Sequence, residues 1–303
     1  MPVSTATWKK MKRNWQLYLL LLPTIAYFIV MEYLPMYGLQ IAFKNYYPSK
    51  GFAGSEWVGW EHFIRFFNSY QFWDILLNTV ILSLYELLTF PIPVAMALLL
   101  NQLISSRYKR IVQTVTYAPH FISTVVLAGM MYLFLSPQTG LLNRILSMFT
   151  GNTIYFLGEA AWFKSIFVWS GVWQNMGWGM IIYLAALTAI NPELHEAAVM
   201  DGANKFRRIW HIDLPGIMPT VMILFILNIG NLMTLGFEKA YLLQNPLNIA
   251  SSEIIQTYVY KRGLAGGDFS YASAIGLFNS VINFLLLVLV NSLARRMKQT
   301  SLW

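Results

Sequence analysis

Six stretches of the sequence are apolar over the length of a membrane-spanning helix, and this feature most constrains the fold. They run over residues 15–35, 75–100, 111–135, 165–190, 214–235 and 272–293. A helix needs about 20 apolar residues to cross the hydrocarbon core of a bilayer. Only 11% of the residues are charged, against about 25% in an average soluble domain. We therefore predict an all-α integral membrane protein with six transmembrane helices.

The first two stretches contain features that modify this picture. Lys9, Lys10, Lys12 and Arg13 precede the first stretch as they would a signal peptide, but no small-residue cleavage pattern follows it. We therefore predict a retained helix. Pro91 and Pro93 lie inside the second stretch. Because proline lacks a backbone donor and clashes with the preceding turn, a kink or break is expected there.

The basic residues predict the orientation. With six crossings both termini lie on one side, and that side carries 13 of the 21 lysines and arginines, in the N-terminal segment, 107–110, 205–208 and 295–298. Loops rich in lysine and arginine stay in the cytoplasm, so both termini are predicted to be cytoplasmic. Because this distribution accounts for the net charge of +8, nucleic acid is not expected as a partner.

The loop between the fourth and fifth stretches, residues 191–215, is predicted to form a cytoplasmic helix–turn–helix elbow. Asn191 is a good N-cap and Pro192 suits the first helical position. Gly202 can end this helix because glycine adopts a positive φ without steric cost. A second short helical piece is expected to follow and to end at Pro215. Such an elbow is a rigid lever on which a cytoplasmic partner can push.

The same loop carries a motif of seven fixed positions: Glu196-Ala197-Ala198, Gly202, Ile212 and Leu214-Pro215. With every interval kept, it resembles the signature of the permease subunits of binding-protein-dependent ABC importers. Outside the loop, the segments 35–43, 97–101 and 118–123 and the pair Asn78-Thr79 are similar to the carbohydrate branch of that family. Within that branch they look most like permeases that import oligosaccharides released from complex polysaccharides.

This resemblance implies a fold, partners and a function. The fold is the type I ABC importer permease fold, a five-helix core plus an N-terminal helix, in the bacterial cytoplasmic membrane. A second, homologous permease completes a heterodimer, two ATPase subunits dock on the cytoplasmic loops, and an extracytoplasmic solute-binding protein delivers the substrate. The expected function is ATP-driven import of an oligosaccharide derived from a polysaccharide.

The resemblance also divides the chain into five parts. These are a cytoplasmic N-terminus (1–14), a peripheral transmembrane helix (15–35), an extracytoplasmic loop (36–74), the permease core (75–293) with its coupling loop at 191–215, and a cytoplasmic tail (294–303). In the extracytoplasmic loop, Trp57, Trp60, Phe63 and Phe67 are spaced to share one face of an interfacial helix. Anchoring of the second transmembrane helix by an aromatic belt explains them as well.

Carried over by position, the residues that couple this chain to the ATPase are Glu196, Ala197, Ala198, Asp201, Gly202, Ile212, Leu214 and Pro215. The small alanines allow close seating of the helix, and Glu196 can accept hydrogen bonds from the ATPase. The chain has no phosphate-binding Gly-x-x-x-x-Gly-Lys-Ser/Thr segment. ATP and magnesium are therefore expected on the partner ATPase, and this chain is expected to be no enzyme and to bind no cofactor.

Polar and aromatic residues inside the stretches are candidates for the substrate pathway, because intramembrane polar groups usually face a bundle interior or a wet cavity. The candidates are Trp169, Trp173, Gln174, Asn175, Asn228, Asn279 and Asn283. Aromatic plates beside amides suit the apolar faces and hydroxyl edges of a sugar. Helix packing and interhelical hydrogen bonds explain the same residues. Glu86 is the only acid well inside a stretch, where we expect a buried, paired or neutral carboxyl.

Two other classes of protein are alternatives. An ion-coupled secondary transporter of a small polar solute predicts several intramembrane acids and inverted repeats, whereas Glu86 stands nearly alone. An intramembrane transferase predicts a catalytic cluster, and no nucleophile–base set is present. The four histidines, His62, His120, His195 and His211, lack metal-ligand spacing, so no metal site is expected.

Overall fold

The computed structural model describes residues 13–297 and 300–303 of the chain. The basic residues Lys9, Lys10, Lys12 and Lys298, which contribute to the predicted orientation, lie outside this part. The described chain is mainly helical, and its residues form two compact units. The first unit comprises the residues up to Phe67 together with Arg262–Leu277, and the second comprises Asn68–Lys261 together with Phe278–Trp303.

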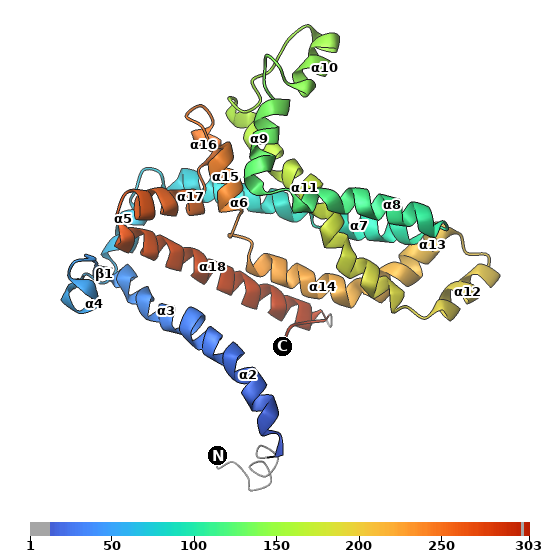
Figure 1. The fold of residues 1–303 in the computed structure, drawn as a ribbon, viewed down its shortest axis with the longest axis horizontal. Coiled ribbons are helices and arrows are strands. Elements are labelled where there is room, and N and C mark those ends of the chain that lie inside the picture. Colours follow the sequence, from blue (N-terminus) through green and yellow to red (C-terminus); the bar gives the residue numbers. More distant parts are fainter. Residues whose placement is uncertain (1–12, 298–299) are drawn as a thin grey trace. The chain divides into compact units, whose positions relative to one another are not determined.

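The first unit begins with a continuous apolar helix over Trp15–Phe43, drawn in blue in Figure 1. It consists of α2 (Trp15–Phe28), a π-helical segment (Ile29–Tyr33), α3 (Leu34–Met36) and a 3-10 segment (Tyr37–Phe43). No residue of α2 is buried. A helix that is apolar on all sides requires lipid or another protein around it, as expected for a peripheral transmembrane helix.

A small two-stranded sheet and a short helix follow. β1 (Lys44–Asn45) pairs antiparallel with β2 (Glu56–Trp57) around α4 (Gly51–Gly54), and α5 (Glu61–Phe67) comes next. The predicted interfacial helix is therefore shorter than expected. Trp57 lies in a strand, and Gly59 at φ 61° turns the chain before α5 begins. The four aromatic residues thus do not share one helix; instead Phe43 contacts the rings of Trp57, Trp60 and Phe63.

The second unit contains two interrupted helices. α6 (Phe72–Thr89) and α7 (Pro91–Asn101) are separated at Phe90, which confirms the break predicted from the prolines. α8 (Ser106–Tyr117) runs through a 3-10 turn (Ala118–Phe121) to α9 (Thr124–Phe134), and the two helical parts are bent by 99°. The Ser123 side chain caps α9 by accepting a hydrogen bond from the Val126 N–H. This serine stabilises the new helix start after the bend.

α11 (Ala160–Thr188) is the central helix of this unit, packing against α7, α8, α14 and α6 (Figure 1). Gly177 on α11 allows its close approach to α8, because a Cβ there would overlap the backbone carbonyl of Thr116. One buried cluster lies between α7, α11 and α14 and contains Met180 and Ile217. A second surrounds Phe163 and Phe167.

The other helices of the chain complete the fold. They are α10 (Leu141–Thr150), α12 (Pro192–Met200), α13 (Lys205–Arg208), α14 (Leu214–Gly230), α15 (Phe237–Leu243), α16 (Ile249–Ser252), α17 (Ile255–Tyr260) and α18 (Phe269–Arg296). A π-helical segment (Lys261–Ala265) precedes α18. The first residues of α18 belong to the first unit and the remainder to the second.

Four helices within residues 13–297 and 300–303 are long and apolar enough to cross a membrane, and the bent α8–α9 pair makes five. α11 has 29 residues, which is also long enough, but four tryptophans, Gln174 and Asn175 make it less apolar. Each of these six segments overlaps one of the six predicted from the sequence. The arrangement is compatible with six crossings.

Candidate functional site

The elbow begins with α12, whose ends form as the sequence predicts. The Asn191 side chain accepts a hydrogen bond from the Glu193 N–H at 3.1 Å, and Pro192 occupies the first turn. Gly202 has a φ of 76°, and the following Ala203 N–H donates to the carbonyl of Ala198 at 2.8 Å. Because Gly202 takes the left-handed conformation just beyond α12, N–H groups of the turn can donate to the last carbonyls of the helix.

No residue of α12 is buried. Of the motif residues, Glu196, Ala197 and Asp201 are exposed and Ala198 is half-buried. The apolar side chains of Leu194, Val199 and Met200 are also exposed, Met200 by 87%. An exposed helix that combines apolar and acidic side chains is available to a partner protein.

The second half of the elbow is longer than predicted. α13, a π-helical segment over Ile209–Asp213 and α14 form one continuous helix over Lys205–Gly230. The expectation that Pro215 closes a separate short helix is therefore wrong. Pro215 occupies the first turn of α14. The π-helical segment before it has a wider hydrogen-bond register, so the helix continues although proline has no N–H to donate. Ile212 and Leu214 are half-buried beside it.

Asp213 joins three parts of the elbow region. Its side chain has no exposed surface. One carboxylate oxygen accepts a hydrogen bond at 2.8 Å from Gln102, which follows α7. The other lies 3.2 Å from Nε2 of His195 on α12, an ion-pair distance without hydrogen-bond alignment. Arg208 also attracts the carboxylate. The start of α14, α12 and the end of α7 are thus held together by one buried carboxylate.

Sequence reasoning did not identify this cluster. Asp213 occupies the variable position between Ile212 and Leu214 of the motif, and Gln102 lies more than a hundred residues away. The one available signal is an acid at the entry to an apolar helix, which requires a partner when it is buried.

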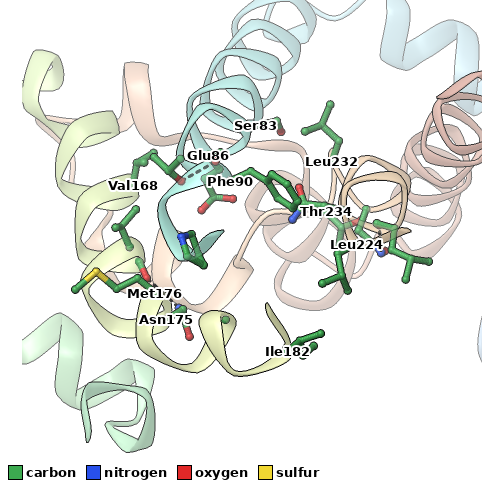
Figure 2. A pocket seen from close by; sticks show the side chains of 18 of the residues that line it. Ser83, Glu86, Phe90, Val168, Asn175, Met176, Ile182, Leu224, Leu232 and Thr234 are labelled. Atoms are coloured by element: carbon green, nitrogen blue, oxygen red, sulfur yellow. Dashed lines mark hydrogen bonds between the residues drawn. The ribbon is translucent and has the colours of Figure 1, made fainter. Parts of the chain in front are cut away.

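A cavity of about 630 Å³ lies within the second unit. Figure 2 shows Glu86, Phe90, Val168, Asn175 and Thr234 around it. It is lined by side chains from α6, α7, α11 and α14 and from the residues that follow α14. The polar residues among them are Ser83, Glu86, Thr89, Asn175, Asn228, Asn231, Thr234 and Lys239. Its volume lies within the roughly 300–1,000 Å³ range of small-molecule sites.

Two of the predicted pathway residues, Asn175 and Asn228, line this cavity. Asn175 also contacts Nδ1 of His120 through its side-chain oxygen at 3.0 Å. The other five are not among the lining residues. Trp173 is exposed on α11, and Trp169 donates from its indole N–H to the hydroxyl of Tyr85 at 2.9 Å.

The remaining three amides have structural partners or are buried. Gln174 donates to the carbonyl of Ile122 at 2.8 Å, directly at the bend between α8 and α9. Asn283 accepts from the Met233 N–H and donates to the Thr234 hydroxyl, both at 2.9 Å. Asn279 is buried on α18. The amides at 174 and 283 therefore satisfy irregular backbone near a helix break or end.

The cavity is also lined by a cation, Lys239, which lies outside the six apolar stretches of the sequence. Lys239 on α15 is 9% exposed, and its Nζ donates to the carbonyl of Phe167 at 2.8 Å. It attracts the carboxylate of Glu86, which lines the same cavity. A single lysine in a loop sequence gives no signal that the loop folds back against the helices.

Long apolar helices, an exposed elbow between two of them and a cavity among them are features of a membrane permease subunit. In comparison with protein families, residues 89–299 match the binding-protein-dependent transport system inner membrane component. The chain belongs to this family. Its function is therefore that of a non-enzymatic translocation subunit of an ABC importer.

Individual relatives extend over nearly the full chain. Protein LplB of Bacillus subtilis (strain 168) is 44% identical over 97% of this chain and 92% of its own length. The polygalacturonan/rhamnogalacturonan transport system permease protein YteP of the same organism is 43% identical over 95% and 90%. A chain in the crystal structure of a bacterial ABC transporter involved in the import of the acidic polysaccharide alginate is 41% identical, with a TM-score of 0.89 over 97% of this chain and 100% of that chain. This likeness establishes the type I importer permease fold.

Proposed function

We propose that this chain is one of two homologous permease subunits that together import an oligosaccharide released from a polysaccharide. The observation that carries this proposal is the cavity inside the second unit, which combines apolar walls with amide and hydroxyl side chains, among them Thr89, Asn175, Asn228 and Asn231. Such a lining matches the apolar faces and hydroxyl edges of a sugar ring. Relatives named for polygalacturonan and alginate transport support the same substrate class.

The importer would take its substrate from an extracytoplasmic solute-binding protein. A related transporter has been crystallised in complex with an alginate pentasaccharide-bound periplasmic protein. By the same reasoning the chain lies in the bacterial cytoplasmic membrane with both termini in the cytoplasm, the orientation that the distribution of basic residues favours. ATP and magnesium would be bound by two ATPase subunits and not by this chain.

Coupling would occur at the elbow. We assign docking on the ATPase to α12, with Glu196, Ala197, Ala198, Asp201 and Gly202 in contact or at the turn. Ile212, Leu214 and Pro215 would connect that contact to α14. That no residue of α12 is buried supports this assignment, and the Asp213 cluster would give the elbow the rigidity that a lever needs.

The experiment that tests the function is uptake into proteoliposomes. The complete importer, with both permeases, the ATPase and the solute-binding protein, is reconstituted with ATP inside. Defined oligosaccharides, acidic and neutral, are offered outside. Import of at least one oligosaccharide that depends on both ATP and the binding protein is the expected result. Failure to import any of them, with import of a monosaccharide or another solute instead, overturns the assignment.

A further inference from the structure

The cavity in the second unit carries two opposite charges on different helices. Lys239 comes from α15 and Glu86 from α6, and both line the cavity. They attract each other but, among the described residues, the two do not form a direct ion pair within 4.0 Å. The cavity is therefore lined by one cation and one anion that are not paired directly with each other.

The surroundings of Lys239 hold its buried ammonium group in place. Its Nζ donates one hydrogen bond to the carbonyl of Phe167 and lies 3.9 Å from the centre of the Phe167 ring. An ammonium has three donors and a ring face attracts a cation, so the group is held in place with donor capacity left over. Gly171 makes room for it, because a Cβ at that position would lie 2.7 Å from Nζ.

Glu86 offers hydrogen-bond acceptors, whereas Lys239 offers donors. The Thr89 hydroxyl donates to the backbone carbonyl of Glu86 and not to its carboxylate. No donor from the described residues forms a hydrogen bond with the carboxylate oxygens. Figure 2 shows the Glu86 side chain at the cavity beside Phe90 and Val168. An ionised carboxylate is an acceptor with about four lone-pair sites, and here those sites face the cavity.

We propose that this cavity binds a uronic acid residue of the transported oligosaccharide, with its carboxylate toward Lys239 and its hydroxyl groups toward Glu86. In a pyranose uronic acid the carboxylate on C5 and the hydroxyls on C2 and C3 lie at opposite edges of the ring. One such ring can therefore meet the cation and the acceptor of this cavity with different edges. This proposal rests on the proposed function, because it names the substrate class of the same importer.

The chain allows a direct test of the cavity, because it contains no cysteine. Asn231 is an exposed residue of the cavity lining, and its side chain donates a hydrogen bond to the carbonyl of Leu227 in the helix before it. Asn231→Cys therefore provides the one thiol of this chain, and its modification by an anionic and by a cationic methanethiosulfonate reagent is followed in the complete importer. The quantity compared is the rate of modification by the anionic reagent divided by the rate for the cationic reagent. We expect this ratio to fall about fivefold or more in Lys239→Met, because a nearby positive charge is lost, and to rise about as much in Glu86→Gln, because a nearby negative charge is lost.

The second measurement uses sugars as protecting ligands. Trigalacturonate should slow modification of Cys at position 231 more than its carboxyl-reduced, neutral counterpart does, and Lys239→Met should remove this difference. Lys261→Met is the matched control, because Lys261 pairs with Glu253 at 3.0 Å and is not a cavity residue. It should leave both the rate ratio and the protection unchanged.

The outcomes separate this inference from the proposed function. If the wild-type importer takes up oligosaccharides, but Lys239→Met changes neither the rate ratio nor the difference in protection, the uronic acid site is overturned while the importer remains. If Lys261→Met acts as strongly as Lys239→Met, the effect belongs to the net charge of the chain, and the site is equally overturned. Absence of any oligosaccharide uptake would refute the function itself. Thermal unfolding of each variant in detergent confirms that the protein compared is folded.

Discussion

The imidazole of His195 lies 3.2 Å from the carboxylate of Asp213, which joins the helix at the front of the elbow to the start of α14. Since that carboxylate also accepts from Gln102, replacing it removes the acceptor of Gln102 and the ion-pair partner of His195, both of which are half-buried. We expect Asp213→Ala to destabilise the elbow by about 1–3 kcal/mol. The measurement is the ATPase rate of the complete importer with and without substrate-loaded binding protein, which should lose its stimulation.

His211→Ala serves as the control for this variant. His211 lies in the same loop, but it is exposed, and Nδ1 of its ring lies 3.0 Å from the backbone carbonyl of Arg207. Stimulation should persist in His211→Ala. Equal stimulation of the Asp213 variant and the wild type would show that the buried carboxylate does not position the elbow.

A second prediction concerns Gly202. A Cβ at this position would meet no atom within 4 Å, so a side chain is resisted only by the backbone conformation at φ 76°. We expect Gly202→Val to cost about 1–2 kcal/mol locally and to lower transport strongly, and Gly202→Asn to cost much less, because asparagine visits this region readily. Transport rates at matched membrane levels provide the measurement.

Gly151 supplies the matched position outside the elbow. It ends α10 at φ 70° with equally open surroundings. Gly151→Val should therefore suffer the same strain without loss of ATPase recruitment. If Gly202→Val and Gly151→Val reduce recruitment alike, the effect is general instability and not displacement of the coupling helix.

A third prediction reverses the charge of an exposed motif residue. Glu196→Lys should weaken recovery of the ATPase with the permease, because like-charge contacts at an interface can cost several kcal/mol. Co-purification from membranes measures this. Glu193→Lys changes the same charge one turn earlier on α12 and should cost only the smaller loss of its helix-terminus interaction, roughly 0.3–1 kcal/mol. Wild-type recovery with Glu196→Lys would remove this residue from the docking surface.

A fourth prediction tests the packing of α11 on α8. At Gly177 any side chain must displace the backbone of Thr116, so we expect Gly177→Ala to destabilise the protein by about 1–3 kcal/mol. Gly129→Ala on α9 meets no atom within 4 Å and should be neutral or slightly stabilising. The midpoints of thermal unfolding in detergent compare the two. A Gly177 variant as stable as Gly129→Ala would contradict the close helix contact.

The sequence predicted the features that depend on local chemistry. Apolar length located the helices, the prolines located the break before α7, and Asn191 and Gly202 located both ends of α12. It could not predict contacts between distant segments. Lys239 and Phe167, or Asp213 and Gln102, meet only because the helices pack. The continuation of the helix through Pro215 depends on a π-helical register, for which the sequence gives no clear signal.

The candidate pathway residues illustrate the same limit. The sequence predicted the same pathway role for the amides of Asn228 and Asn283. In the structure Asn228 lines the cavity, whereas Asn283 accepts a hydrogen bond from the backbone N–H of Met233. Both uses require an amide inside an apolar helix. The distinction depends on whether a neighbouring backbone group lacks a partner, which is a property of the folded helices.

The hydrogen bond from Gln174 to the carbonyl of Ile122 limits how this permease can move. If the 99° bend between α8 and α9 straightened, α11 and this carbonyl would separate, and a carbonyl without a donor is costly where water is excluded. We therefore expect the bend to stay fixed during the transport cycle. Whole helices would then move around this corner, and a label pair across it should keep a constant distance in the inward- and outward-open states.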